Sequence, residues 1–196
     1  MERPLGSVQL RVLEYLAENP NSLIKPISRA IRKDYKSTYE AVKRLKAKGY
    51  ITDASLKANN KGVGFPSYRL TGKGIAYLMR HGRPETSMKA FENYCKEASP
   101  LYEMYSQLKQ HVSQKIIIKL LKATGEGIIK FGNKVRQIDN LQRILLTFTS
   151  SLTPKESIQL RKATKKIPAL RKLISQAAYQ VYKEFSEEEQ KEKESS

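Results

Sequence analysis

Two stretches of this chain decide its fold: KSTYEAVKRLKAKGYI at residues 36–51 and SYRLTGKGIAYL at residues 67–78. In the first, an apolar stripe with a 3.6-residue period lies opposite a row of basic residues, which predicts an amphipathic helix that ends at Gly49. The second predicts a strand that turns at Thr71 into another helix, because a threonine hydroxyl is a good N-cap. The basic segment KANNKG at residues 57–62 separates them, and its asparagines and glycine suit a hairpin tip.

The helix expected at residues 37–48 divides into a buried face and a free face. Ser37 and Glu40 have the spacing of a capping box, so the helix is expected to start near Ser37, after a break at residues 34–36. The residues expected to pack inward are Ala41, Val42 and Leu45. The residues left on the opposite face are Tyr39, Lys43, Arg44 and Lys46, and Tyr39 can equally pack beneath the helix. A helix with this division suits the major groove of duplex DNA.

Two helical patterns precede this one. Ser7 is a candidate N-cap for a helix that ends at Asn19–Ser22, and Pro26 suits the first turn of a second, shorter helix. The inward positions of the first helix are Val8, Val12, Leu13 and Leu16. In the second helix, Ile27, Ala30 and Ile31 are expected inward, and Arg29, Arg32 and Lys33 outward.

A β-hairpin is expected between the two diagnostic stretches. Tyr68 and Leu70 share one face of its second strand, and Ser67 and Arg69 share the other. Lysines in the segment 57–62 place charge at the tip, where it would meet phosphate or the minor groove. The helix after Thr71 carries Ile75, Leu78 and Met79 and ends before Pro84.

TYEAVKRLKAKGYI, the hairpin and SYRLTGKG together resemble the DNA-binding domain of winged helix-turn-helix transcription regulators of the MarR and PadR type. That family carries a Tyr-x-x-Leu-x-x-Leu-x-x-x-Gly-apolar-Ile recognition segment and a Tyr-x-Leu-Thr-x-x-Gly exit from the wing. Here Val42 replaces the first leucine and Tyr50 the apolar position, and the match covers residues 5–82. The resemblance implies recognition-helix contacts at Ser37, Tyr39, Lys43 and Arg44, and wing contacts at Lys57 through Lys61.

The charge of the chain agrees with a polyanionic partner. The 196 residues carry a net charge of +18. Lys and Arg outnumber Asp and Glu by 17 to 6 in residues 1–84 and by 18 to 8 in residues 85–186, whereas residues 187–196 are acidic. An excess of this size indicates nucleic acid or an anionic membrane surface. The side chains predicted to contact DNA are Arg29, Arg32, Lys36, Ser37, Tyr39, Lys43, Arg44, Lys46, Lys57, Asn59, Asn60, Lys61 and Arg69.

In the second half of the chain, the sequence pattern predicts only helices. A short helix near residues 87–97 is followed by three apolar stripes of some twenty residues each, and a capping box with proline at N1 starts the third stripe at Thr153. Gly125 and Gly127 are expected to break the chain, and Pro168 to kink or split the third helix. The stripes run through residues 101–120, 128–148 and 158–185.

These stripes can close as a bundle within one chain or be shared between two chains. A homodimer is the favoured reading, because two DNA-reading modules placed on two half-sites multiply specificity. The alternative is a monomeric bundle that binds another protein. Basic residues on the outer faces leave open a second phosphate contact, and the tail at 187–196 is expected to be disordered.

Catalysis is not expected. His81 and His111 are the only histidines, neither has a metal-ligand spacing with Cys95, and the phosphate-binding glycine loops are incomplete, so neither a metal nor a cofactor is predicted. A single cysteine allows no intrachain disulfide, and neither a leader nor a membrane span is visible in the sequence. A cytoplasmic, nucleoid-associated protein is therefore expected.

The sequence thus predicts a mainly α fold with a small β-hairpin. Residues 1–84 are expected to form a winged helix-turn-helix domain, residues 85–186 a helical dimerisation or partner-binding region, and residues 187–196 an acidic tail. The function favoured is that of a dimeric transcription regulator that binds double-stranded DNA. The alternative is a DNA-organising or assembly adaptor with weak sequence preference, as in plasmid partition, replication or chromatin.

Overall fold

The computed structural model describes residues 4–58, 64–94, 100–132, 138–168 and 171–172. Over these residues the chain is mainly helical and has one two-stranded antiparallel sheet, which confirms the predicted mainly α class with a small hairpin. The chain divides into two compact units, Met1–Glu97 and Ala98–Ser196. The first unit passes the expected boundary at residue 84, because the helix after that residue packs onto the first unit.

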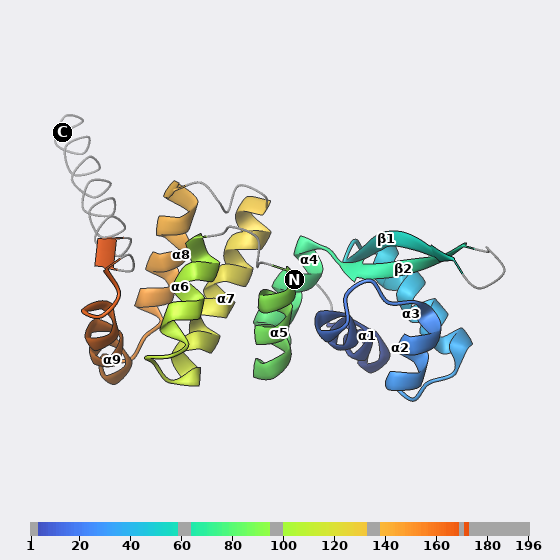
Figure 1. Ribbon diagram of the computed structural model, residues 1–196, viewed down its shortest axis with the longest axis horizontal. Coiled ribbons are helices and arrows are strands. Elements are labelled where there is room, and N and C mark those ends of the chain that lie inside the picture. Colours follow the sequence, from blue (N-terminus) through green and yellow to red (C-terminus); the bar gives the residue numbers. More distant parts are fainter. Residues whose placement is uncertain (1–3, 59–63, 95–99, 133–137, 169–170, 173–196) are drawn as a thin grey trace, which may run out of the picture. The chain divides into compact units, whose positions relative to one another are not determined.

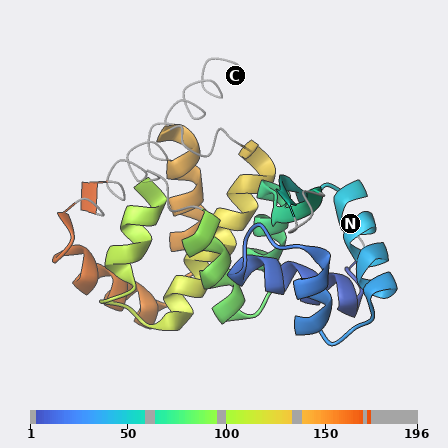
Figure 2. The ribbon, with the colours of Figure 1, turned by 45° about the vertical axis from the view of Figure 1, so that its right-hand side comes forward.

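The first unit is built around its first helix. Its elements are α1 (Ser7–Glu18), α2 (Ile24–Ala30), α3 (Tyr35–Ala47), β1 (Ile51–Ala58), β2 (Gly64–Leu70), α4 (Gly72–His81) and α5 (Pro84–Tyr94) (Figure 1). Helix α1 contacts α2, α3, α4, α5 and β2, and the turned view shows it among the other helices of this unit (Figure 2). Its completely buried residues are Val12, Leu13, Leu16 and Ala17. Burial of these four side chains is the main apolar contribution of α1 to the core.

Helix α3 begins earlier than the sequence predicts. Its N-cap is Asp34, whose carboxylate accepts a hydrogen bond from the backbone N–H of Ser37 at 2.8 Å. Hydrogen bonds from Ser37 lower the pKa of the Asp34 carboxyl. The predicted capping box of Ser37 and Glu40 is therefore wrong, because the aspartate three residues upstream of Ser37 satisfies the free N–H groups of the first turn. Residues 35 and 36 consequently belong to the helix.

Two smaller predictions in the first two helices are also wrong. The N-cap of α1 is Gly6 rather than Ser7, and Gln9 completes the cap by accepting from the Gly6 N–H at 3.2 Å. Ala30 is exposed, whereas Ser28 occupies the inward position and donates to the Lys25 carbonyl at 2.9 Å. A short helix can bury a serine at low cost where the serine hydroxyl bonds to its own backbone.

The hairpin is longer than predicted and has an irregularity. Asp53 pairs with Tyr68, and the register shifts before Leu56 pairs with Pro66. Ser67 is completely buried, contrary to the prediction that it shares the exposed face with Arg69. The shift in register places residues 54 and 55 opposite Ser67. The Ser67 hydroxyl donates to the Ser55 carbonyl at 2.8 Å and lies 3.1 Å from the Ser55 hydroxyl, so this buried polar group has hydrogen-bond partners.

A third backbone segment joins the sheet. Ser22 and Tyr68 exchange two backbone hydrogen bonds, at 3.1 and 2.9 Å, in an antiparallel bridge. The sequence predicts only the end of α1 at residues 19–22 and gives no signal for this bridge. The bridge fixes the segment before α2 against β2, and therefore fixes α2 and α3 relative to the hairpin.

Helices α4 and α5 close the unit. The predicted cap of α4 is confirmed, since the Thr71 hydroxyl accepts from the Gly74 N–H at 3.2 Å. A side chain on Gly74 would place its Cβ only 2.2 Å from the Tyr50 carbonyl oxygen, so only glycine allows this close approach. Helix α5 is anchored by the Tyr94 hydroxyl, which donates to the Leu16 carbonyl at 2.9 Å and accepts from the Leu70 N–H at 3.2 Å.

The second unit contains α6 (Pro100–Leu108), α7 (Gln114–Phe131), α8 (Ile138–Ser150) and α9 (Pro154–Thr164). Helix α7 packs against both α6 and α8 (Figure 1). The first predicted stripe is divided into two helices by a turn at residues 109–113. The predicted break at Gly125 and Gly127 is wrong, because both residues are buried inside α7. A Cβ on Gly127 would lie 2.4 Å from the Ile144 side chain, so this glycine allows α7 and α8 to approach closely.

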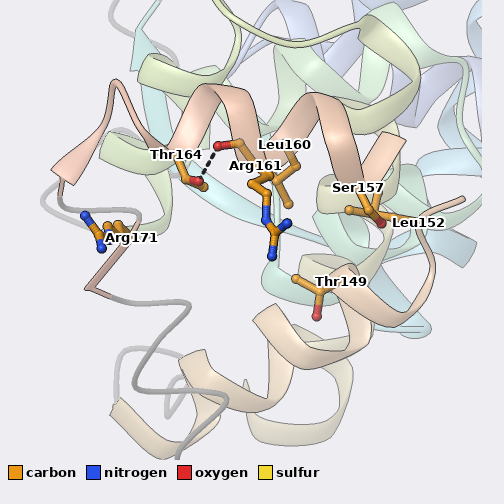
Figure 3. A pocket seen from close by; sticks show the side chains of 7 residues that line it. All are labelled: Thr149, Leu152, Ser157, Leu160, Arg161, Thr164 and Arg171. Atoms are coloured by element: carbon orange, nitrogen blue, oxygen red, sulfur yellow. Dashed lines mark hydrogen bonds between the residues drawn. The ribbon is translucent and has the colours of Figure 1, made fainter. Parts of the chain in front are cut away.

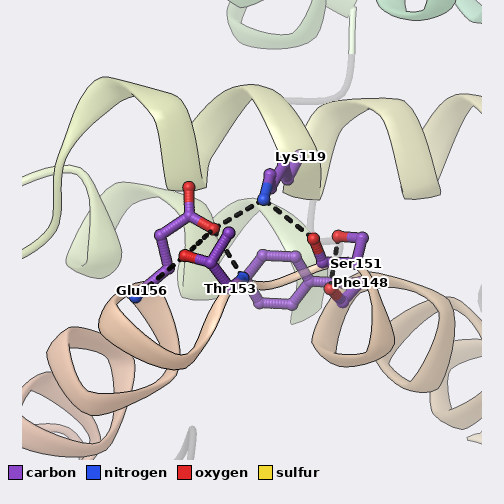
Figure 4. Close-up of polar contacts among 5 residues, drawn as sticks. All are labelled: Lys119, Phe148, Ser151, Thr153 and Glu156. Atoms are coloured by element: carbon purple, nitrogen blue, oxygen red, sulfur yellow. Dashed lines mark hydrogen bonds and ion pairs between the residues drawn. The ribbon is translucent and has the colours of Figure 1, made fainter.

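A polar cluster ties α7 to the start of α9 (Figure 4). The predicted capping box is confirmed: Thr153 and Glu156 satisfy each other's backbone N–H groups. The ammonium group of Lys119 on α7 lies 2.6 Å from the Glu156 carboxylate and donates to the Ser151 carbonyl at 2.8 Å. The hydrogen bond from Lys119 and those from Thr153 lower the pKa of Glu156 to about 2.

The third predicted stripe is only partly described. Helix α9 ends at Thr164, before Pro168, so the stripe is split ahead of the proline, which is one of the two predicted outcomes. Ile158 faces solvent at 57% exposure, contrary to its place in the stripe, whereas Leu160 and Ile167 are buried. The remainder of this stripe and the predicted acidic tail lie outside the described residues.

Candidate nucleic-acid interface

Helix α3 presents a broad basic face to solvent. Its inner face consists of Thr38, Ala41, Val42 and Leu45, all buried, as predicted for the three apolar positions. Lys36 and Lys43 are exposed and stand seven residues apart, which is about two helical turns, so they lie on one face. Glu40 is half-buried and is the only acidic residue within α3. Thirteen helical residues span about 20 Å, which is long enough to follow a DNA groove.

Two tyrosines extend this face. Tyr35 and Tyr39 are 56% and 44% exposed, and they are one helical turn apart. The sequence left open whether Tyr39 packs beneath the helix, and its exposure places the ring at the surface. Tyr35 is not among the predicted contacts, because the sequence predicts a helix start near Ser37 and therefore a break at residues 34–36. A tyrosine ring beside lysines offers both an apolar contact and a hydroxyl to a nucleic acid.

The predicted basic residues before α3 are all exposed. Arg29 lies in the last turn of α2, and Arg32 lies in the turn between α2 and α3 with a φ of 52°. Backbone in this left-handed region is uncommon for arginine, so the turn holds Arg32 in a defined place. From Ile24 to Lys48 the chain has nine lysines and arginines against Asp34 and Glu40. The electrostatic potential over α2 and α3 is therefore positive.

Lys46 is less free than the sequence suggests. Its ammonium group lies 2.5 Å from the Asp53 carboxylate on β1, and both side chains are half exposed. The hydrogen bond that Lys46 donates to Asp53 is the main cause of the raised pKa of Lys46. This ion pair neutralises one predicted contact at the edge of the basic face. Lys36, Lys43 and Arg44 are the cations of α3 that have no carboxylate partner among the residues that the structure describes.

The hairpin exposes one basic and one aromatic side chain. Arg69 is exposed on β2, with Thr52 as its partner in the register, and Phe65 near the tip is 44% exposed. The backbone of Lys57 pairs with Phe65. The predicted wing contacts Asn59, Asn60 and Lys61 lie outside the described residues.

The predicted site residues on α2, the turn, α3 and β2 therefore belong to one unit, and those that the structure describes are exposed. Ser37 is exposed too, although its backbone N–H serves the cap of α3. Over the described residues, no group of three or more His, Cys, Asp and Glu side chains is placed to hold a metal ion. Within the same residues, no helix is long and apolar enough to cross a membrane.

None of the protein-family models, curated proteins or solved structures compared with this chain matches it. The resemblance to winged helix-turn-helix regulators thus stays a prediction carried by the residues quoted for it.

Proposed function

We propose that the first unit is a winged helix-turn-helix domain that binds double-stranded DNA. The observation that carries this proposal is the exposed basic face of α3, where Lys36, Tyr39 and Lys43 lie together above a fully buried apolar stripe. The order of α2, turn, α3 and hairpin supports it, as does the Ser22 bridge that joins the segment before α2 to β2. In this reading α3 enters the major groove, and the hairpin with Arg69 lies on the adjacent phosphates.

Each group of side chains has its own role in this proposal. Arg29 and Arg32 lie outside α3 and contact the phosphate backbone, which positions the domain without reading sequence. Lys43 and Arg44 lie in the middle of α3, where side chains of a recognition helix reach base edges. Both are long donors that suit guanine O6 and N7 in the major groove.

The salt dependence of binding tests the phosphate contacts. If Arg29, Arg32, Lys36 and Arg69 each neutralise one phosphate, the plot of log affinity against log salt has a slope of about −4. Affinity for a 20-base-pair duplex, measured by fluorescence anisotropy, should then fall about 10²-fold between about 50 and 200 mM NaCl. An affinity that hardly responds to salt contradicts the proposal.

The DNA sequence preference of alanine variants distinguishes residues that contact bases from residues that contact phosphates. Alanine at Lys43 or Arg44 should relax the preferred sequence, as read by binding selection from random duplexes. Alanine at Arg29 or Arg32 should weaken every duplex by a similar factor and leave the preference unchanged. The reverse pattern would mean that the two groups of residues have exchanged roles.

A dimeric transcription regulator is the form of this function that we favour. Two copies reading half-sites about 34–36 Å apart gain specificity that one domain lacks. The second unit offers exposed aliphatic side chains for association on three different helices, Ile129 on α7, Leu146 on α8 and Ile158 on α9. The solution mass of the full chain tests this point, and the favoured form predicts twice the monomer mass.

A second candidate function rests on the charge of residues 85–186, where 18 lysines and arginines face 8 acidic residues. A protein that is basic along its whole length suits DNA organisation or assembly with weak sequence preference. Footprinting on genomic fragments separates the two candidates. Protection of a few inverted repeats supports the regulator, whereas length-dependent coating supports the organising protein.

A further inference from the structure

The second unit contains a pocket that the proposed DNA interface does not use (Figure 3). It has a volume of about 240 Å³ and is formed by the end of α8, by α9 and by the segment that follows α9. This volume lies just below the range of about 300–1,000 Å³ that is usual for small-molecule sites, so it suits a small ligand. Its lining residues are Thr149, Leu152, Ser157, Leu160, Arg161, Thr164 and Arg171.

Two arginines give the pocket its charge. The guanidinium group of Arg161 extends from α9 toward Thr149 of α8, and Arg171 lies at the opposite edge (Figure 3). Within the residues that the structure describes, neither arginine has a carboxylate partner within ion-pair distance. A guanidinium group that lines a pocket and has no such partner has its donor fork available for a ligand oxyanion.

The surroundings reinforce this charge. Between residues 138 and 172 the chain has eight lysines and arginines and only two acidic residues, Asp139 and Glu156. Glu156 is engaged by Lys119 and Thr153. The pocket therefore lies in a positive field that favours an anion.

The hydroxyl groups and leucines of the lining indicate which other chemical groups a ligand would carry. Thr149 and Thr164 donate to the backbone carbonyls of Leu146 and Arg161, at 3.0 and 2.8 Å, so their donors are already used. Leu160 is buried beneath the pocket and Leu152 forms part of its wall, which provides an apolar surface next to the arginines. A ligand with one oxyanion and one apolar group would use both parts of the lining.

We propose that this pocket binds a small organic oxyanion, a phosphate monoester or a carboxylate carried on an apolar body. Arg161 binds the oxyanion by paired N–H donors, Arg171 adds a second positive charge, and the leucines cover the apolar body. The site belongs to the second unit alone and does not depend on DNA binding by the first.

Calorimetric titration of the full chain with four probes tests the site. Phenyl phosphate and phenylacetate carry an oxyanion on a phenyl group, inorganic phosphate lacks the apolar body, and benzyl alcohol lacks the charge. Saturable binding of phenyl phosphate or phenylacetate, about ten-fold or more tighter than binding of inorganic phosphate and benzyl alcohol, supports the proposal, and the better of the two identifies the oxyanion.

Arg161→Gln and Lys162→Gln form the matched pair of variants. Both remove one charge from exposed neighbouring residues of α9, but only Arg161 lines the pocket. Arg161→Gln should weaken binding of the better probe by about ten-fold, and Lys162→Gln by less than two-fold. Equal losses in the two variants, tight binding of benzyl alcohol, or an absence of saturable binding by both oxyanion probes would each overturn the proposal.

Discussion

Helices α3 and α7 both carry lysines on an amphipathic framework, yet they leave very different surfaces to solvent. Four of the 13 residues of α3 are buried, whereas eight of the 18 residues of α7 are. Helix α7 packs between α6 and α8, and its Lys119 is engaged by Glu156. Its exposed lysines, Lys115, Lys122 and Lys130, share the surface with Glu126 and Ile129. Helix α3 is covered on one side only and keeps Lys36, Tyr39 and Lys43 together on the other. Net charge, which is similar in the two halves, therefore does not distinguish the two helices, and the proposed DNA site rests on the broad, unpacked basic face of α3.

The largest difference in DNA affinity between the two helices is expected from charge reversal on each of them. Lys36→Glu with Lys43→Glu replaces two attractive charges by two repulsive ones on the free face of α3. We expect DNA affinity to fall by about 10²–10³-fold, which is about 3–4 kcal/mol. The matched double variant on α7, Lys122→Glu with Lys130→Glu, changes the net charge equally and should cost less than about five-fold. Similar losses in both variants, measured by fluorescence anisotropy, would remove the distinction between the helices.

Gly74→Ala tests the frame that holds α3 and the hairpin. The new Cβ would lie 2.2 Å from the Tyr50 carbonyl oxygen, and a backbone atom cannot move away as a side chain can. We expect a loss of about 3 kcal/mol in the free energy of unfolding of the first unit, at the upper end of overpacking costs. Gly72→Ala is the control, because Gly72 is exposed in the first turn of the same helix. Urea unfolding followed by circular dichroism measures both, and equal midpoints would contradict the close approach.

Gly127→Ala is the corresponding change in the second unit. Here the new Cβ meets the Ile144 side chain at 2.4 Å, and a side chain can partly rotate away. We expect a smaller loss of about 1–2 kcal/mol in the free energy of unfolding. The same urea experiment measures it. A variant as stable as the parent would mean that α7 and α8 do not approach at Gly127.

Acid should weaken the second unit through Glu156. The pKa of this carboxyl is about 2 in the folded chain, against an ordinary value of 4.5. Because the folded-state pKa is depressed, its contribution to stability is complete above about pH 4.5 and disappears as the pH falls through about 2. The difference in urea midpoint between the parent and Glu156→Gln should be constant above pH 5 and shrink toward pH 2. A difference that does not change with pH would show that the ion pair with Lys119 contributes nothing.

The smallest expected effect concerns the ion pair at the edge of the α3 face. Asp53→Asn removes a carboxylate from this edge and releases Lys46 from its partner. DNA affinity should rise by about two- to five-fold at low salt, and the gain should shrink as salt screens the charges. Stability should change by less than about 1 kcal/mol, as for other exposed ion pairs. A lower affinity in this variant would indicate that Asp53 holds Lys46 in a binding geometry.

The features predicted correctly from the sequence are those encoded within a few neighbouring residues. The caps at Thr71 and Thr153 and the buried stripe of α3 each depend on spacings of three or four positions. The sequence predicts a break at Gly127, but the role of this glycine depends on Ile144, which lies on a different helix. The pair of Lys46 with Asp53 and the pocket around Arg161 were missed for the same reason, since each joins side chains from different elements. The predicted start of α3 is wrong for a local reason. Asp34 and Ser37 are both good N-cap residues, and only Asp34 caps the helix.

Binding of DNA at the free face of α3 can be tested by an NMR titration of the uniformly ¹⁵N-labelled full chain with a 20-base-pair duplex at about 50 mM NaCl. If DNA binds there, the largest amide shift changes should fall in α3 and the turn before it, with further changes around Arg69. These changes should disappear when salt displaces the DNA. Changes confined to the unit Ala98–Ser196, with α3 unaffected, would contradict binding at this face.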